Sequence, residues 1–207
     1  MPSRRLVVGV SMSSYFLLWL LLLLSIQLGA QENAGSKNDN LRRIDPLVTT
    51  TIEHYEIRGT SFDDIRQELD AKGHGGAGST TGEVTYRFKS RKRDGTCEIL
   101  EVRASCTTKV RLPRWYGVEK TSAQVQAIWN EAYKKLRKHE MGHVQICIEV
   151  AKEVEKALWA TPASNDCADV DQEARARANV LVRGMNAKQL AFDEREYGST
   201  VRSELRK

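Results

Sequence analysis

Residues 139–143 read His-Glu-Met-Gly-His, a spacing that could bind a metal ion and use it for hydrolysis. Two residues four apart on a helix lie on one face, one turn above each other. His139 and His143 could therefore present two imidazole nitrogens to one zinc ion. Glu140 would lie beside them, where a carboxylate can take a proton from a zinc-bound water. The stretch predicts a zinc-hydrolase core.

The surrounding segment predicts a long amphipathic helix from about Thr121 to Ala160, stopped by Pro162. Thr121 and Gln124 have the spacing of a capping box at its start. Apolar side chains recur every three or four residues, and the two histidines continue the same stripe. An unliganded pair of histidines with a glutamate would be costly to bury, and a metal ion removes that conflict.

The third metal ligand must come from another part of the chain. The extended metzincin motif is absent, because Ile146 and Glu149 stand where its glycine and third histidine would be. A carboxylate from the last predicted helix is the alternative, either Asp193 or Glu196, and each could equally be a solvated surface acid. Tyr197 could hydrogen-bond a developing oxyanion if it approached the metal.

The other elements predict an α+β fold, in which a small antiparallel sheet packs with two long helices. Alternating β-forming residues predict strands at 49–59, 84–88, 97–102 and 107–112. Pro113 would end the last of these strands. His54 in the first strand is a weaker ligand candidate than the pair at 139 and 143.

Capping signals and glycines mark the remaining segments. Ser61 and Asp64 predict a capping box for a short helix to about residue 71, and Asp169 predicts the start of the last helix, towards Gly198. Five glycines in 72–83 predict a mobile loop or a wide turn. His74 lies in this segment and is a weaker candidate for a metal ligand, because a glycine-rich segment suits a mobile lid better than a fixed ligand.

The N-terminus predicts export. Residues 1–5 form a short basic segment, an uncharged apolar stretch follows it, and small residues stand at 29–30. This order is typical of a signal peptide, which would span residues 1–30. An uncleaved membrane anchor is the alternative, because the apolar stretch approaches the roughly 20 residues that span a bilayer. Residues 31–48 predict a flexible lead-in, and residues 49–200 the folded domain.

The four cysteines outside the signal segment predict two disulfides, which suits an exported protein. Three connectivities are possible. The short loops favour the pairing of Cys97 with Cys106 and of Cys147 with Cys167. The absence of a C-x-x-C pair argues against a cysteine-based zinc site.

The charge of the chain is mildly basic. The formal net charge is +5, and residues 1–30 contribute two of the arginines. Basic and acidic residues are interspersed, so we expect no nucleic-acid partner. The densest basic run, RKRDG at 91–95, lies between two predicted strands and is expected to be a solvated hairpin tip.

Several ordered segments carry a family resemblance. They are HYEIRGTSFDDIRQEL, VTYRF, GTCEILEV, LPRW at 112–115, Trp129, KHEMGH and AFDEREYGS. Their order over about residues 50–200 resembles bacterial predicted secreted or periplasmic zinc-dependent proteases, classed as domain of unknown function 922. The resemblance implies a zincin-like active-site helix. Phe192-Asp193 matches the start of the family's closing motif, but Tyr197-Gly198 stands where the family has His-Gly. The resemblance therefore implies that Asp193 is the polar residue that matches the family's motif, with Glu196 and Tyr197 close by.

Together these features predict an exported zinc-dependent metallohydrolase, a peptidase acting on peptides or proteins of the cell envelope. Any membrane contact would be through an uncleaved signal segment. The alternative is a non-catalytic envelope domain in which the metal is structural or absent. Structural zinc sites have four protein ligands, whereas catalytic sites leave a position for water. The number of ligands that converge on His139 and His143 therefore separates the two hypotheses.

Overall fold

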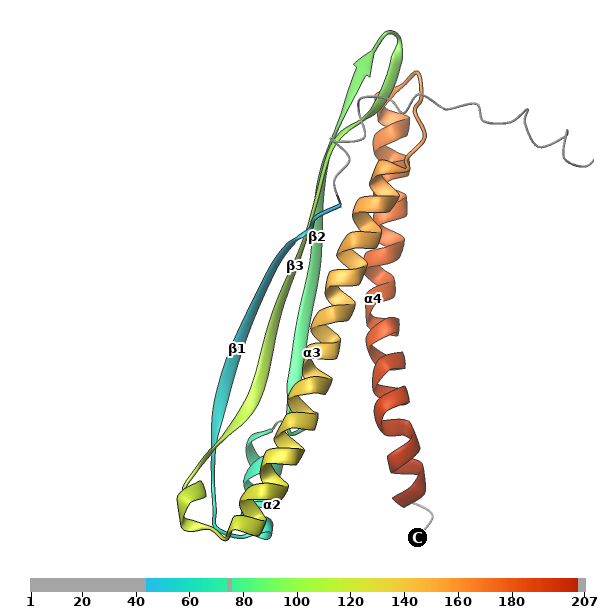
Figure 1. The fold of residues 1–207 in the computed structure, drawn as a ribbon. Helices are drawn as coiled ribbons and strands as arrows, with labels where there is room; N and C mark the ends of the chain where they lie inside the picture. Colours follow the sequence, from blue (N-terminus) through green and yellow to red (C-terminus); the bar gives the residue numbers. More distant parts are fainter. Residues whose placement is uncertain (1–43, 74–75, 205–207) are drawn as a thin grey trace, which may run out of the picture. The chain divides into compact units, whose positions relative to one another are not determined.

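A computed structural model describes residues 44–73 and 76–204, with side chains as far as Glu196. The predicted signal segment and the lead-in up to residue 43 lie outside the described residues. The elements, in chain order, are β1 (Leu47–Arg58), α2 (Phe62–Lys72), β2 (Ser79–Arg93), β3 (Thr96–Tyr116), a 3-10 turn (Val118–Lys120), α3 (Ala123–Trp159) and α4 (Cys167–Glu204). A small sheet and long helices confirm the predicted α+β fold (Figure 1).

The sheet is mixed rather than antiparallel. Its strand order is β1-β3-β2, with β3 parallel to β1 and antiparallel to β2. The prediction of an antiparallel meander was wrong because the two segments 97–102 and 107–112 are parts of one strand. Residues 103–106 between them contain no glycine or proline that would turn the chain. β1 begins at Leu47, inside the predicted lead-in.

Pro113 lies within β3 instead of ending it. Proline lacks a backbone N–H, so it is normally excluded from strands that are paired on both sides. The pairing of β2 with β3 extends only as far as Arg111, and Pro113 has a partner, Tyr55, in β1. β3 therefore has a neighbour on only one side at Pro113.

The hairpin between β2 and β3 turns at Asp94 and Gly95, both with positive φ angles of 51° and 84°. Positive φ angles at both central residues are typical of a type I′ turn, whose twist matches that of the two strands it joins. The prediction of a hairpin tip at 91–95 is confirmed, with Arg91–Arg93 forming the end of β2.

The helices begin mostly where the sequence predicts. The capping box of Ser61 and Asp64 is present at α2. At α3 the predicted capping box is replaced by Ser122, whose side chain accepts a hydrogen bond from the Val125 N–H. None of the helices within residues 44–73 and 76–204 has both the length and the apolar character needed to span a membrane.

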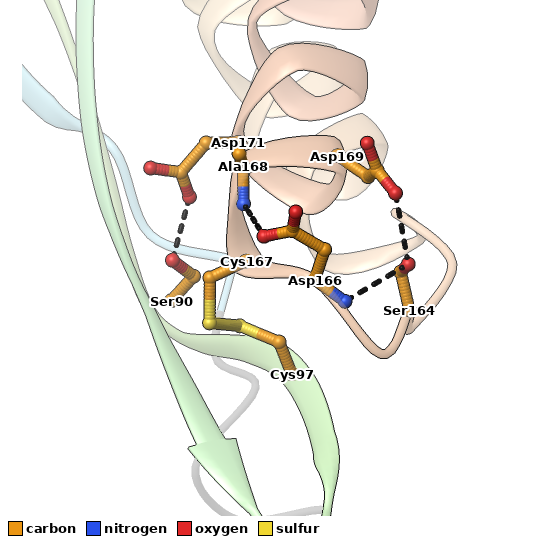
Figure 2. Close-up of a disulfide and its surroundings, with 8 residues drawn as sticks. All are labelled: Ser90, Cys97, Ser164, Asp166, Cys167, Ala168, Asp169 and Asp171. Atoms are coloured by element: carbon orange, nitrogen blue, oxygen red, sulfur yellow. Dashed lines mark hydrogen bonds between the residues drawn. A yellow bond between two sulfur atoms is a disulfide. The ribbon is translucent and has the colours of Figure 1, made fainter.

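α4 begins at Cys167, two residues before the predicted cap Asp169. The carboxylate of Asp166 accepts a hydrogen bond from the Ala168 N–H at 2.9 Å (Figure 2). Asp169 instead accepts a hydrogen bond from the Ser164 hydroxyl. α4 also continues beyond Gly198, to Glu204.

The predicted disulfide pairing was wrong. The bonds join Cys97 to Cys167 and Cys106 to Cys147. Cys97 and Cys106 lie on the same strand nine residues apart, about 30 Å at 3.3 Å per residue, so they cannot meet. Cys97 instead bonds to α4 and Cys106 to α3. Both bonds lie in the main core, the largest cluster of buried apolar residues between the sheet and the two long helices. Figure 2 shows the Cys97–Cys167 bond beside the start of α4.

Candidate metal centre

The H-E-x-x-H residues lie on the face of α3 that packs into the fold. His139, Glu140 and His143 are 8%, 4% and 9% exposed. They form the floor of a cleft of about 790 Å³. The segment that leads into β2, together with the start of β2, forms one wall, with lining residues Gly76–Gly82. The second wall is formed by α4, with lining residues Met185, Asn186, Gln189 and Asp193.

Asp193 of α4 completes a compact group of three possible metal ligands. Its Oδ1 lies 3.1 Å from His139 Nε2 and 2.9 Å from His143 Nε2. The two histidine Nε2 atoms lie 3.1 Å apart. Ligand atoms about 2.1 Å from one zinc ion in tetrahedral geometry would lie about 3.4 Å apart, close to the observed distances. This His139–His143–Asp193 group could hold a metal ion.

Hydrogen bonds alone do not account for this triangle of atoms. Each imidazole nitrogen presents either one N–H or one lone pair in the plane of its ring. Hydrogen bonds between all three pairs of atoms would need one proton on each of the three contacts. Each nitrogen can serve only one direction, so at least one pair would bring two lone pairs or two N–H groups face to face. A cation between the three atoms uses a lone pair from each and removes that repulsion. The donor set therefore fits a metal ion, and one of the borderline type that favours imidazole and carboxylate.

Gln189 fixes which nitrogen of His143 can bind a metal. Its Nε2 donates a hydrogen bond to the His143 carbonyl at 3.2 Å, which sets the orientation of the amide. Its Oε1 lies 2.5 Å from His143 Nδ1 and can only accept, so Nδ1 carries the proton. In the neutral ring, Nε2 then keeps its lone pair towards His139 and Asp193. Partners of this kind orient histidine ligands in metal sites.

Gly142 allows α4 to approach the two histidines. A Cβ at this position would lie 2.9 Å from Cε1 of Phe192 and closer still to its Cζ. The Phe192 ring is stacked on His139, with centroids 4.9 Å apart, and lies edge-on to His143 at 5.0 Å. Phe192 thus contacts both imidazoles, and Asp193 follows it directly in the chain. The missing side chain at Gly142 thus leaves room for the Phe192 ring.

The wall formed by β2 holds Glu140 in place. Thr80 Oγ1 donates a hydrogen bond to Glu140 Oε2 at 2.7 Å and lies 3.2 Å from its carbonyl oxygen. A Cβ on Gly78 would lie 2.6 Å from Oε1 of Glu140. The backbone at Gly78 can therefore approach the carboxylate closely only because it has no side chain.

Tyr55 anchors the glycine-rich segment next to this wall. Its hydroxyl donates to the Ala77 carbonyl at 2.6 Å. Burial raises the pKa of the Tyr55 hydroxyl above its usual value, and the Arg111 guanidinium opposes that shift. The phenol is therefore protonated, and able to donate, over the whole neutral range. The predicted loop at 72–83 ends at residue 78, because Ser79–Gly82 already belong to β2.

The other candidate residues do not join the group. Glu196 and His54 are exposed, and neither belongs to the His139–His143–Asp193 cluster. His74 and the side chain of Tyr197 lie outside the described residues. Sequence reasoning missed Gln189 and Thr80. Gln189 lies four residues before Asp193, on the same face of one helix, and this spacing could have indicated it. Thr80 lies in a segment that sequence reasoning treated as a loop.

Residues 52–199 match a family described as bacterial proteins of unknown function (DUF922). The chain belongs to this family. No curated protein and no solved structure matches it. The match to DUF922 covers β1 from Ile52, all of β2, β3 and α3, and α4 as far as residue 199, so all of the residues in the cleft lie within the part shared with the family.

Proposed function

We propose that this DUF922 protein is an exported zinc-dependent metallohydrolase, and that it cleaves peptides or proteins of the cell envelope. The observation that carries the proposal is the convergence of His139, His143 and Asp193 on one point beside Glu140, in an accessible cleft. Two disulfides are consistent with an exported protein.

Three protein ligands favour a hydrolytic over a structural zinc site. His139, His143 and Asp193 would hold the ion, and a zinc ion bound there supplies Lewis-acid activation of water near neutral pH. Within the described residues, the group that could hold a metal contains three members and no fourth. Structural sites are closed by four protein ligands, whereas hydrolytic sites keep one position open.

Glu140 is the proposed general base. Its carboxylate lines the same cleft as the three ligands, and Thr80 donates a hydrogen bond to one of its oxygens. The other oxygen, close to Gly78, is left to accept the proton of the attacking water. Thr80 would orient the carboxylate without taking a proton itself. General-base catalysis of this kind contributes typically 10²–10⁴-fold, roughly, to the rate.

The cleft suits an extended peptide. β2 is an edge strand of the sheet, and its residues Ser79–Gly82 line the cleft beside α3. An extended segment can pair with the free edge of a strand through main-chain hydrogen bonds, which places it without requiring particular side chains. The described lining on this side is small, consisting of glycine, alanine, serine and threonine. This supports a peptide as substrate, whether from a protein or from the cell wall.

The proposal is tested by measuring zinc content and peptide hydrolysis in the purified protein. We expect about one zinc per chain, lost in His139→Ala. Glu140→Gln should retain the zinc and lose activity by at least about a hundredfold. Thr80→Val should retain zinc and reduce activity less. If Glu140→Gln hydrolyses peptides as fast as the unaltered protein, the mechanism is wrong. Zinc binding without hydrolysis of any envelope peptide would favour the non-catalytic alternative.

A further inference from the structure

Two arginines lie directly opposite each other on the face of the sheet that points away from α3. Arg87 of β2 and Arg103 of β3 are register partners in the antiparallel pair. Their neighbours Val84 and Ala104 are buried in the main core, so the alternate positions 87 and 103 face outwards. Like charges directly opposite each other destabilise a strand pair. A bound anion between the two arginines would remove this repulsion.

The described residues do not supply such an anion as a carboxylate. Within the described part of the chain, Arg103 Nη1 donates to the backbone carbonyl of Asp45, at 3.5 Å. Throughout residues 44–73 and 76–196, neither Arg87 nor Arg103 forms an ion pair with an acidic side chain. The next outward pair along the hairpin differs, since Lys89 forms an ion pair with Glu101 at 2.8 Å. Of these two outward pairs, only that of Arg87 and Arg103 is without a described carboxylate partner.

The surface beside the two arginines is hollow and contains hydrogen-bond donors. A hollow of about 380 Å³ is lined by Arg87, Arg103, Thr85, Ser105, Tyr86 and Leu47. Thr85 and Ser105, which are also register partners, line the same hollow as the two arginines and supply hydroxyl groups. Among the described residues that line the hollow, none is acidic. Two adjacent cations with two hydroxyls are complementary to an oxyanion of charge near −2.

The surrounding hairpin adds to the positive field. Residues 87–103 contain six basic and three acidic side chains, an excess of three positive charges. That excess equals the net charge of the whole chain after residues 1–30, so the remaining sequence is close to neutral. Clustered charge of one sign raises the local concentration of counter-ions and steers charged ligands.

We propose that Arg87 and Arg103, with the hydroxyls of Thr85 and Ser105, bind a phosphate group. A phosphate near neutral pH carries up to two negative charges and can accept paired N–H donors from each guanidinium fork. The site is separate from the metal centre, because it lies on the opposite face of the sheet and about 17 Å along β2 from Gly82. The phosphate is either a free ion or part of a lipid headgroup.

Binding of inorganic phosphate to the full chain, measured by calorimetry at low ionic strength, tests the site itself. We expect saturable binding that is absent with chloride and is weakened at least about tenfold in Arg87→Gln and in Arg103→Gln. Lys89→Gln is the matched control, since it removes the same charge from a position that already has a carboxylate partner. Its phosphate affinity should change less than about twofold. Equal weakening in Arg87→Gln and Lys89→Gln would mean diffuse attraction and would overturn the proposal.

Thermal unfolding gives a second readout, which does not depend on measuring a small heat of binding. Phosphate should raise the Tm of the unaltered protein and leave the Tm of Arg87→Gln unchanged. In phosphate-free buffer, Arg87→Gln should be at least as stable as the unaltered protein, because a like-charge pair has been removed. A lower Tm for Arg87→Gln in that buffer would show that the two arginines stabilise each other and would contradict the argument.

Sedimentation with lipid vesicles distinguishes the source of the phosphate. Binding to vesicles of phosphatidylglycerol but not of phosphatidylcholine, lost in the Arg87→Gln/Arg103→Gln double variant, assigns the site to an anionic headgroup. Binding of inorganic phosphate without vesicle binding assigns it to the free ion. Failure to bind both probes would overturn the proposal. These outcomes do not depend on zinc or on hydrolysis, so they leave the proposed function untouched.

Discussion

Gly142 of α3 and Phe192 of α4 are complementary in shape, with the phenyl ring occupying the space that a side chain at 142 would take. The ring contacts both His139 and His143, and Asp193 comes next in the chain. A helix interior normally disfavours glycine by roughly 1 kcal/mol relative to alanine. Here the glycine lets α4 come close enough for the carboxylate of Asp193 to reach the two imidazoles.

Gly142→Ala should therefore weaken metal binding. The added methyl must push Phe192 away and move Asp193 with it, so zinc affinity should fall by about tenfold to a hundredfold, the range seen when supporting residues of a metal site are lost. Competition with a coloured chelator measures this. Gly184→Ala is the control, because a Cβ there would meet nothing within 4 Å. Equal zinc affinity in the two alanine variants would contradict the role of Gly142.

Gln189 should control the orientation of the His143 ring. Gln189→Leu removes the acceptor for Nδ1 and should lower zinc affinity by about tenfold or more. Gln189→Glu keeps an acceptor at the same position and should retain most of the affinity. Cobalt substitution offers an independent readout, because the visible absorption of bound cobalt reports ligand geometry. The idea fails if the leucine and glutamate variants give the same affinity and spectrum.

The two disulfides should each stabilise the protein substantially. They close loops with sequence separations of 70 and 41 residues. Chain-entropy reasoning gives about 4 kcal/mol for loops of these lengths. Replacing either pair by alanine should lower the free energy of unfolding by an amount of that order, measured by denaturant titration. Peptide mapping without reduction should recover Cys97 with Cys167 and Cys106 with Cys147, and any other pairing would contradict the structure.

The capping box of α2 should be sensitive to acid. Hydrogen bonds from the Thr60 N–H, the Ser61 hydroxyl and the Ser61 N–H lower the pKa of Asp64 below 3.8. Because the folded pKa is the lower one, the stabilisation by Asp64 is present above pH 3.8 and is lost as the pH falls through the folded pKa. An NMR titration of the Asp64 carboxyl tests the direction. A midpoint at or above that of an unfolded peptide would contradict the capping geometry.

Local chemistry in the sequence predicted much of the site and of the elements that carry it. The three-four spacing around His139 and His143 predicted the long α3 helix and the burial of both rings. The capping box at Ser61 and the glycine turn after Asp94 were also predicted, because each depends on residues that are neighbours in the chain. Glu196 was an equal candidate for the third ligand on these grounds, since spacing alone cannot tell which of two carboxylates on one helix face reaches another helix.

The tertiary structure decided everything that depends on contacts between distant segments. The parallel pairing of β1 with β3, the bonds of Cys97 and Cys106 to two different helices, and the convergence of Asp193 on the histidines all join residues far apart in the chain. Residue type and periodicity fix which face of an element is buried, but they do not fix which element covers it. The sequence by itself therefore determined which face of α3 is buried and carries the two histidines, and only the packing of α4 against Gly142 determined that Asp193 meets it.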